Sequence, residues 1–308
     1  MTRLTFAVLG GTALLLAALT VYYSSPAARF FVVQAETAGM KLVAGGQPMS
    51  AWHLSDVTVC LLRRDDFQRT GPAPRDCAGE QFEIIRLDRL DFSWPSGTEV
   101  DFAPGRDGAI LAMVRKGPAG AVALPGGVRL TNGSLLVIPA ATQRTNGPLI
   151  FSGTDLAIGA LPKAGRSNLL SSGQFRAREI LRFRSAPATI LEGSFLPGDR
   201  ISFGSAARND TVASYGTIER ADRRKTSRPL LNVVAFSEPG LTHIVAKRLG
   251  ASDTSDRDPA TWIVPDWTDR IRNDPLGLAI VGLLGLGGAI LSGVASIASL
   301  RRGGGPSA

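Results

Sequence analysis

Four arginines occupy even-numbered positions in the stretch QFRAREILRFRS, residues 174–185. Alternate side chains of an extended strand point to the same face, so these residues would form one row of guanidinium groups. Guanidinium groups bind phosphate or carboxylate bidentately. The stretch therefore predicts a site for an anionic partner, formed by Arg176, Arg178, Arg182 and Arg184.

A solvated strand surface is the alternative interpretation of this row. Arginine stems can cover apolar area while their heads pair with carboxylates on adjacent strands. Two residues also interrupt the pattern, because Glu179 falls on the apolar face and Ile180 falls on the basic one. A β-bulge at this point would reconcile the two faces.

A second basic segment, ERADRRKTSRP at residues 219–229, lies between two expected strands. It carries the further candidates for anionic binding Arg223, Arg224 and Lys225. The chain has a formal net charge of +8, and such a balance favours acidic partners such as lipid headgroups or anionic glycans. The same alternative, a solvated surface, holds for this segment.

The two cysteines, Cys60 and Cys77, bracket a loop that contains RTGPAPRD. A pair with this placement predicts a disulfide of an oxidising compartment. Two separate buried thiols are the alternative. No CxxC spacing is present to suggest a redox or metal site.

The search for catalytic groups finds only dispersed residues. The histidines, His53 and His243, are far apart, and no HExxH, GxSxG, GxGxxG or GxxxxGK[ST] motif occurs. In FLPGDRISF, residues 195–203, the Pro-Gly pair and Asp199 are explained by a hairpin turn in which the carboxylate bonds to the backbone. We therefore predict no catalytic residue, cofactor or metal, and the chain is more in keeping with a binding protein than with an enzyme.

Both ends of the chain carry long runs without a charged residue, at 4–23 and 276–300. A helix of about 20 apolar residues crosses a hydrocarbon core of about 30 Å. The runs predict two transmembrane helices, the first a signal anchor, with a cytoplasmic tail at 301–308. A cleaved signal peptide is the alternative for the first run, because Arg3 precedes it and small residues follow it.

Small residues recur every four positions in the second run, at Gly285, Ala289 and Gly293. This spacing allows a partner helix to approach closely, so the three residues are candidates for helix packing. The alternative is that glycine and alanine only fill the helix.

Residues 27–272 contain many short alternating segments separated by turn residues, which is typical of β-structure. Hairpins are expected at 90–105, around Pro95 and Gly97, and at 128–139, around Asn132 and Gly133. The predicted fold is an all-β extracytoplasmic domain, an antiparallel sandwich or barrel, flanked by two transmembrane α-helices. Two sub-domains could divide near residue 186.

The cysteine pair and a composition rich in arginine, alanine and glycine favour a bacterial inner-membrane protein. Both termini would be cytoplasmic and the main domain periplasmic, a location that argues against a nucleic-acid partner. The first function predicted is an interaction or scaffold protein of the envelope with a protein partner. The alternatives are a binding module for anionic lipid or glycan in envelope biogenesis or transport, and a periplasmic hydrolase with an unrecognised site. In layout alone, the chain resembles membrane-anchored β-jelly-roll proteins of lipopolysaccharide export, from which its second span departs.

Overall fold

The computed structural model describes the following parts of the chain: residues 3–24, 28–46, 51–63, 77, 82–118, 121–159, 170–180, 186–205, 211–221, 229–248, 260–275, 278–280, 282–289 and 292–293. The chain forms two compact units. The larger, here called the β unit, comprises residues 27–187 and 192–264. The smaller, here called the helical unit, comprises residues 1–26, 188–191 and 265–308.

Short strands make up most of the described chain. In order they are β1 (Arg29–Thr37), β2 (Met40–Ala44), β3 (Trp52–Leu62), β4 (Phe82–Phe92), β5 (Glu99–Pro104), β6 (Ile110–Lys116), β7 (Ala121–Ala123), β8 (Arg129–Thr131), β9 (Leu135–Ile138), β10 (Leu149–Ile158), β11 (Leu170–Glu179), β12 (Ala188–Phe195), β13 (Asp199–Ser205), β14 (Ser214–Arg220), β15 (Leu231–Ser237), β16 (Thr242–Arg248) and β17 (Ala260–Ile263). They are interrupted by one short α-helix, α2 (Ala140–Asn146), and by two single-turn 3-10 helices, Arg106–Gly108 and Pro125–Gly127. The β-rich character expected from the sequence is confirmed.

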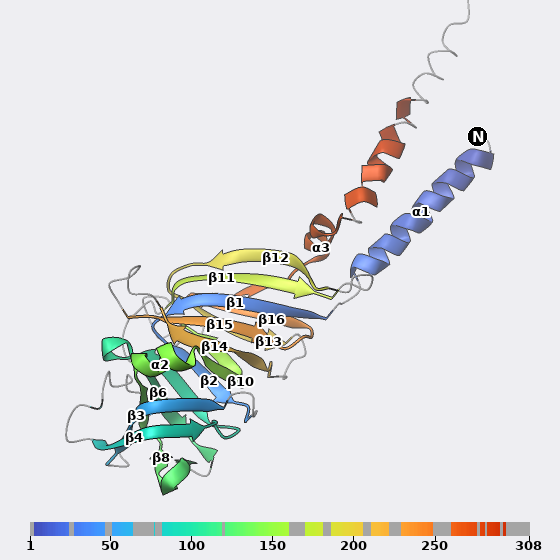
Figure 1. The fold of residues 1–308 in the computed structure, drawn as a ribbon. Helices are drawn as coiled ribbons and strands as arrows, with labels where there is room; N and C mark the ends of the chain where they lie inside the picture. The colour runs from blue at the N-terminus through green and yellow to red at the C-terminus, as the bar shows by residue number, and fades with distance from the viewer. Residues whose placement is uncertain are drawn as a thin grey trace, which may run out of the picture. The chain divides into compact units, whose positions relative to one another are not determined.

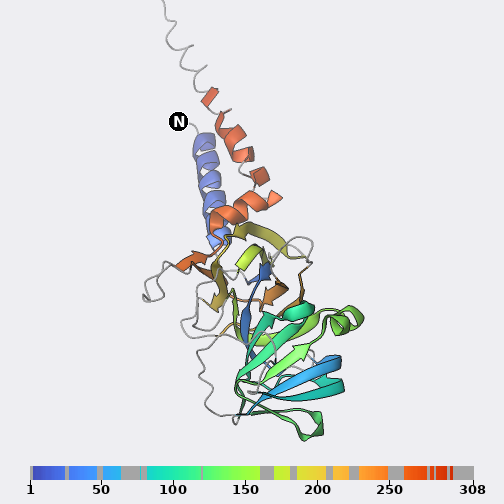
Figure 2. The ribbon, with the colours of Figure 1, turned by 90° about the vertical axis from the view of Figure 1, so that its left-hand side faces the viewer.

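Most of these strands belong to one antiparallel sheet (Figure 1). Its order is β12-β11-β1-β15-β14-β10-β2-β5-β6-β9-β3-β4, with β13, β16 and β17 branching from β10. The branch brings β16 against β1. Strands β7 and β8 form a separate pair, and β3 and β4 lie side by side in Figure 2 as well.

The core of the β unit follows the alternation of side chains along its strands. In β1, Phe31, Val33 and Ala35 are buried, whereas Gln34 between them is exposed. In β6, six consecutive residues are buried, and β8 contacts this strand. Strand β1 therefore has one face in the core and one face available for contacts, whereas β6 is enclosed.

The turn predicted around Pro95 and Gly97 forms, because Thr98 N–H donates to Pro95 O at 3.2 Å and Gly97 has φ +81°. The hairpin predicted there is wrong. Strand β4 pairs with β3, whereas β5 pairs with β2 and β6. The turn reverses the chain locally, but the two flanking strands find partners elsewhere in the sequence.

The Asn-Gly pair behaves in the same way. Gly133 adopts φ +88° in a turn, yet β8 pairs with β7, and β9 pairs with β3 and β6. At Pro197 and Gly198 the turn also forms, and Asp199 Oδ2 accepts the Leu196 N–H at 2.9 Å, as predicted. Strands β12 and β13 are nevertheless not partners, because β12 pairs with β11, and β13 pairs with β10 and β16.

The prediction of two transmembrane helices is wrong. In the part of the chain that the structure describes, no helix combines the length and the apolar character that crossing a membrane requires. Helix α1 (Arg3–Ser24) covers the first run, and the second run is described as short helical stretches at 278–280, 282–289 and 292–293. The prediction rested on the absence of charged residues from the two runs, and this was not enough to establish a transmembrane helix. Three further expectations depended on these helices and are corrected with them. They are a β domain flanked by transmembrane helices, the membrane as a partner, and an inner-membrane location with a periplasmic domain.

The helical unit is held by specific caps and side-chain bonds. Helix α3 (Trp267–Asn273) begins with a capping box, in which Asp266 accepts from the backbone N–H of Asp269 and the Asp269 carboxylate accepts from that of Asp266. At its end, Asn273 Nδ2 donates to Ile190 O at 2.8 Å. A division of the β-rich part near residue 186 stays a prediction.

Candidate functional site

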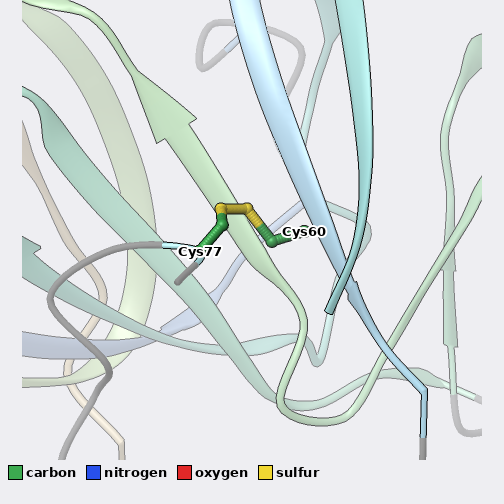
Figure 3. The surroundings of a disulfide bond; sticks show 2 residues. All are labelled: Cys60 and Cys77. Carbon is green, nitrogen blue, oxygen red and sulfur yellow. A yellow bond between two sulfur atoms is a disulfide. The ribbon is translucent and has the colours of Figure 1, made fainter. Parts of the chain in front are cut away.

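The predicted disulfide joins Cys60, near the end of β3, to Cys77, with the two Cα atoms 5.8 Å apart (Figure 3). Cys60 is buried in a cluster with Phe82, Met113 and Leu135. A disulfide is typical of proteins that fold in an oxidising compartment. This part of the sequence-based interpretation is confirmed, and its role is structural.

The arginine row is described only at its first two members, both on β11. Arg176 Nε lies 3.7 Å from Glu192 Oε2, and both side chains are largely exposed. Arg178 is more engaged, because its Nη2 donates to Pro187 O at 3.2 Å and its Cζ lies 5.9 Å from the ring centroid of Phe30. Arg182 and Arg184 lie outside the described residues. Binding of an anionic partner by this row stays a prediction.

Glu179, which interrupted the alternation of the row, is fully buried. The pairing of β11 with β1 is regular here, with Arg29 opposite Glu179 and Phe30 opposite Arg178. The expected bulge is therefore absent from this pairing. Instead, Arg29 Nε lies 3.8 Å from Glu179 Oε1, so a buried cation accounts for the acid on the inner face.

The remaining candidate residues are not brought together with the row. Arg223, Arg224 and Lys225 lie outside the described residues. Gly285, Ala289 and Gly293 have helical backbone and are exposed. A Cβ built on either glycine meets no described atom within 4 Å, so packing of this helix on a partner stays a prediction.

The sheet does assemble a set of polar side chains that the sequence did not point to. The register of β11, β1, β15 and β14 places Ser172 opposite Glu36, Glu36 opposite Asn232, and Asn232 opposite Glu219. Gln174 and Gln34 face each other in the adjoining row. We call this surface the polar face: Gln34, Glu36, Ser172, Gln174, Glu219 and Asn232.

Hydrogen bonds connect the side chains of the polar face in pairs. Gln174 Nε2 donates to Gln34 Oε1 at 3.0 Å, and Asn232 Nδ2 donates to Glu219 Oε1 at 2.6 Å. Ser172 Oγ lies 3.4 Å from Glu36 Oε2. Each amide and carboxylate keeps further bonding positions after these contacts, so the face is ordered and still able to bond a ligand.

The polar face borders a hollow of about 550 Å³, here called the strand hollow. Its lining includes all six residues of that face, together with Ala35, Gly173, Ser194, Arg220 and Ala221. A second hollow of about 340 Å³, here called the helix hollow, adjoins it. Its lining is Ala140, Gln143, Arg144, Gly147, Pro148, Glu219, Arg220 and Ala221.

The two hollows share Glu219, Arg220 and Ala221, and we call them together the groove. Both volumes lie in the range of about 300–1,000 Å³ that is usual for small-ligand sites. Four residues from Glu219 and Asn232 along β14 and β15, Tyr215 stacks on Phe236 with ring centroids 5.5 Å apart. An aromatic surface therefore lies on the same side of the sheet as the polar face.

The histidines lie apart from the groove and from each other. On the surface, His53 Nδ1 and Asp91 Oδ1 are 2.8 Å apart, and this hydrogen bond lowers the pKa of Asp91 below its ordinary value. His243 is buried and stacks on Trp262. Within the described ranges, no group of three His, Cys, Asp or Glu side chains could hold a metal ion.

Comparison with known proteins gives no relative: no protein family, no curated protein and no solved structure matches this chain.

Sequence reasoning missed the polar face because its members belong to four strands. Alternation in RFFVVQAET places Gln34 and Glu36 together on one side of a strand. This part of the polar face could therefore be predicted from the sequence. The neighbours Gln174, Asn232 and Glu219 come close only through the register of the folded sheet.

Proposed function

We propose that this chain is a glycan-binding protein and that the groove holds the glycan. The observation that carries the proposal is the polar face, where amide, carboxylate and hydroxyl groups from four adjacent strands line one hollow. Planar amides and carboxylates can each bond to more than one hydroxyl group, and sugars present hydroxyl groups along their length.

Rigid placement supports the proposal. The side chains of the polar face stand on paired strands and are bonded to one another, so little conformational entropy is lost when they bind a ligand. The Tyr215–Phe236 stack adds an aromatic surface on the same side of the sheet, suited to the apolar face of a sugar ring. The polar face thus supports the glycan-binding alternative that the sequence suggested. The scaffold role stays a prediction.

A glycan array probed with the labelled full-length chain tests the proposal. The test variant replaces Gln34 and Gln174 by Ala together, because each is the other's hydrogen-bond partner and both are exposed. The control is Arg89→Ala, which removes an exposed side chain of β4 outside the groove. We expect the wild type and the control to retain the same glycans and the double variant to lose them.

Two results would overturn the proposal. One is an array on which the wild type retains no glycan. The other is retention that the double variant leaves unchanged while its thermal unfolding matches that of the wild type.

A further inference from the structure

We infer that the helix hollow binds an acid group, so that the glycan taken by the groove is an acidic one. The inference rests on the proposed function and names the class of ligand. The chemistry shared by such groups is that of a carboxylate or a phosphate, which guanidinium groups bind through paired hydrogen bonds. Three residues form the basis of this site: Arg220, Arg144 and Gly108, on which the Arg220 guanidinium lies.

Arg220 ends β14 at the point where the two hollows meet. Its guanidinium lies directly on Gly108, where a Cβ atom would collide with Nη1, Cζ and Nε. Gly108 is buried and has φ +82°, a conformation that glycine adopts without cost. A Cβ atom at position 108 would therefore displace the guanidinium from this place.

The charge of Arg220 has no partner within the described part of the chain. No ion pair or hydrogen bond joins it to another described side chain, and the neighbouring carboxylate, Glu219, accepts from Asn232 at 2.6 Å. A partly buried cation without a partner is a favourable site for an anion.

Helix α2 supplies a second cation to the helix hollow. Arg144 lines it and is exposed, with Nε 3.4 Å from Ala140 O, a long contact that commits little of the guanidinium. Gln143 lies nearby, with its Nε2 3.5 Å from both Gly108 O and Ile138 O. The hollow therefore presents two guanidiniums against one carboxylate, that of Glu219.

Isothermal titration of the full-length chain tests the inference with a matched pair of probes. One probe is a hexameric oligouronate, and the other is the same oligosaccharide after reduction of its carboxyl groups to alcohols. Charge-assisted hydrogen bonds predict that the wild type binds the acidic probe about 10- to 100-fold more tightly. The preference should shrink at high salt.

Arg220→Gln and Arg144→Gln should lower affinity for the oligouronate towards that for the reduced probe, so that the preference for the acidic probe is lost. The control Arg89→Gln makes the same change of charge at an exposed position of β4 and should retain the preference. Inorganic phosphate added as a competitor separates two sources of recognition. If phosphate displaces the oligouronate, the site binds oxyanions in general. If phosphate does not displace it, the site is selective for the sugar acid. Either result agrees with the inference.

Equal affinity of the wild type for the two probes would overturn the inference and leave the proposed function standing. Binding of neither probe would also overturn the inference, and the glycan array decides separately whether the proposed function stands. A preference that survives in a folded Arg220→Gln, Arg144→Gln double variant would place the acid group elsewhere and reject the assignment.

Discussion

His243 shows how a single residue can couple stability to pH. Its ring is buried and stacks on Trp262, with centroids 4.6 Å apart and an interplanar angle of 16°. Burial lowers the pKa of His243 below its ordinary value of 6.5, and the positive charge of Arg29 adds to the effect. The folded protein therefore favours the neutral imidazole more than the unfolded chain does.

The consequence is a loss of stability on mild acidification. A base whose pKa is lowered by folding contributes stability that is present above its unfolded pKa and is lost as the pH falls below it. We expect the free energy of unfolding to fall between pH 7.5 and pH 5.5 in the wild type and to fall less in His243→Phe. Chemical denaturation at a series of pH values measures this, with His53→Gln as the control because the chain has two histidines. An undiminished fall in His243→Phe would contradict the assignment.

At the scale of elements, the sequence predicted turns more accurately than pairings. Pro95, Gly97 and Gly133 do form turns, because the conformations that these residues favour are local properties. The flanking strands pair with segments far away in the chain, and which partner a strand chooses depends on packing of the whole core. The same limit hid the polar face, whereas the disulfide was visible because two cysteines allow one pairing.

The disulfide is the covalent constraint on the long β3–β4 connection. Its two cysteines are separated by 17 residues, and the chain-entropy account assigns about 3 kcal/mol to a loop of this size. The test variant is Cys77→Ser, because Cys77 is the less buried partner. We expect its free energy of unfolding to fall by about 3 kcal/mol, measured by guanidinium denaturation.

Reduction of the wild type by dithiothreitol is the matched control, since it breaks the same bond without a substitution. It should give a similar loss of stability. Unchanged stability in both would mean that packing around Cys60, Met113 and Leu135 closes the loop without the bond.

For the whole molecule, the sheet order predicts where the backbone opens first. Strands β1 and β15 have partners on both edges, and their inward residues Phe31, Val33, Val233 and Ala235 are fully buried. The only described partner of strand β17 is β16, and Trp262 of β17 is 63% exposed. Opening free energies in such a structure range from near zero at edges to the global value in the core.

Hydrogen exchange followed by mass spectrometry checks this order. Peptides from β1 and β15 should exchange slowest, at a rate that tracks global unfolding when denaturant is added, and peptides from β17 should exchange fastest among the strands. Equal protection of β17 and β1 would contradict the sheet order described here. The sequence could predict that strands dominate the chain, but it could not assign this ranking, which depends on position in the sheet.

The pairing of β1 with β15 also affects how the protein is made. The Phe31 N–H donates to Ser237 Oγ across 206 residues of chain. At a synthesis rate of about 5–20 residues per second, β1 waits roughly 10–40 seconds before this partner exists. Until its other partner, β11, has been made, Phe30, Phe31, Val32 and Val33 form an unpaired apolar strand, the kind of segment that aggregates or is held by a chaperone. The edge that pairs with β15 then stays open until the last strands emerge.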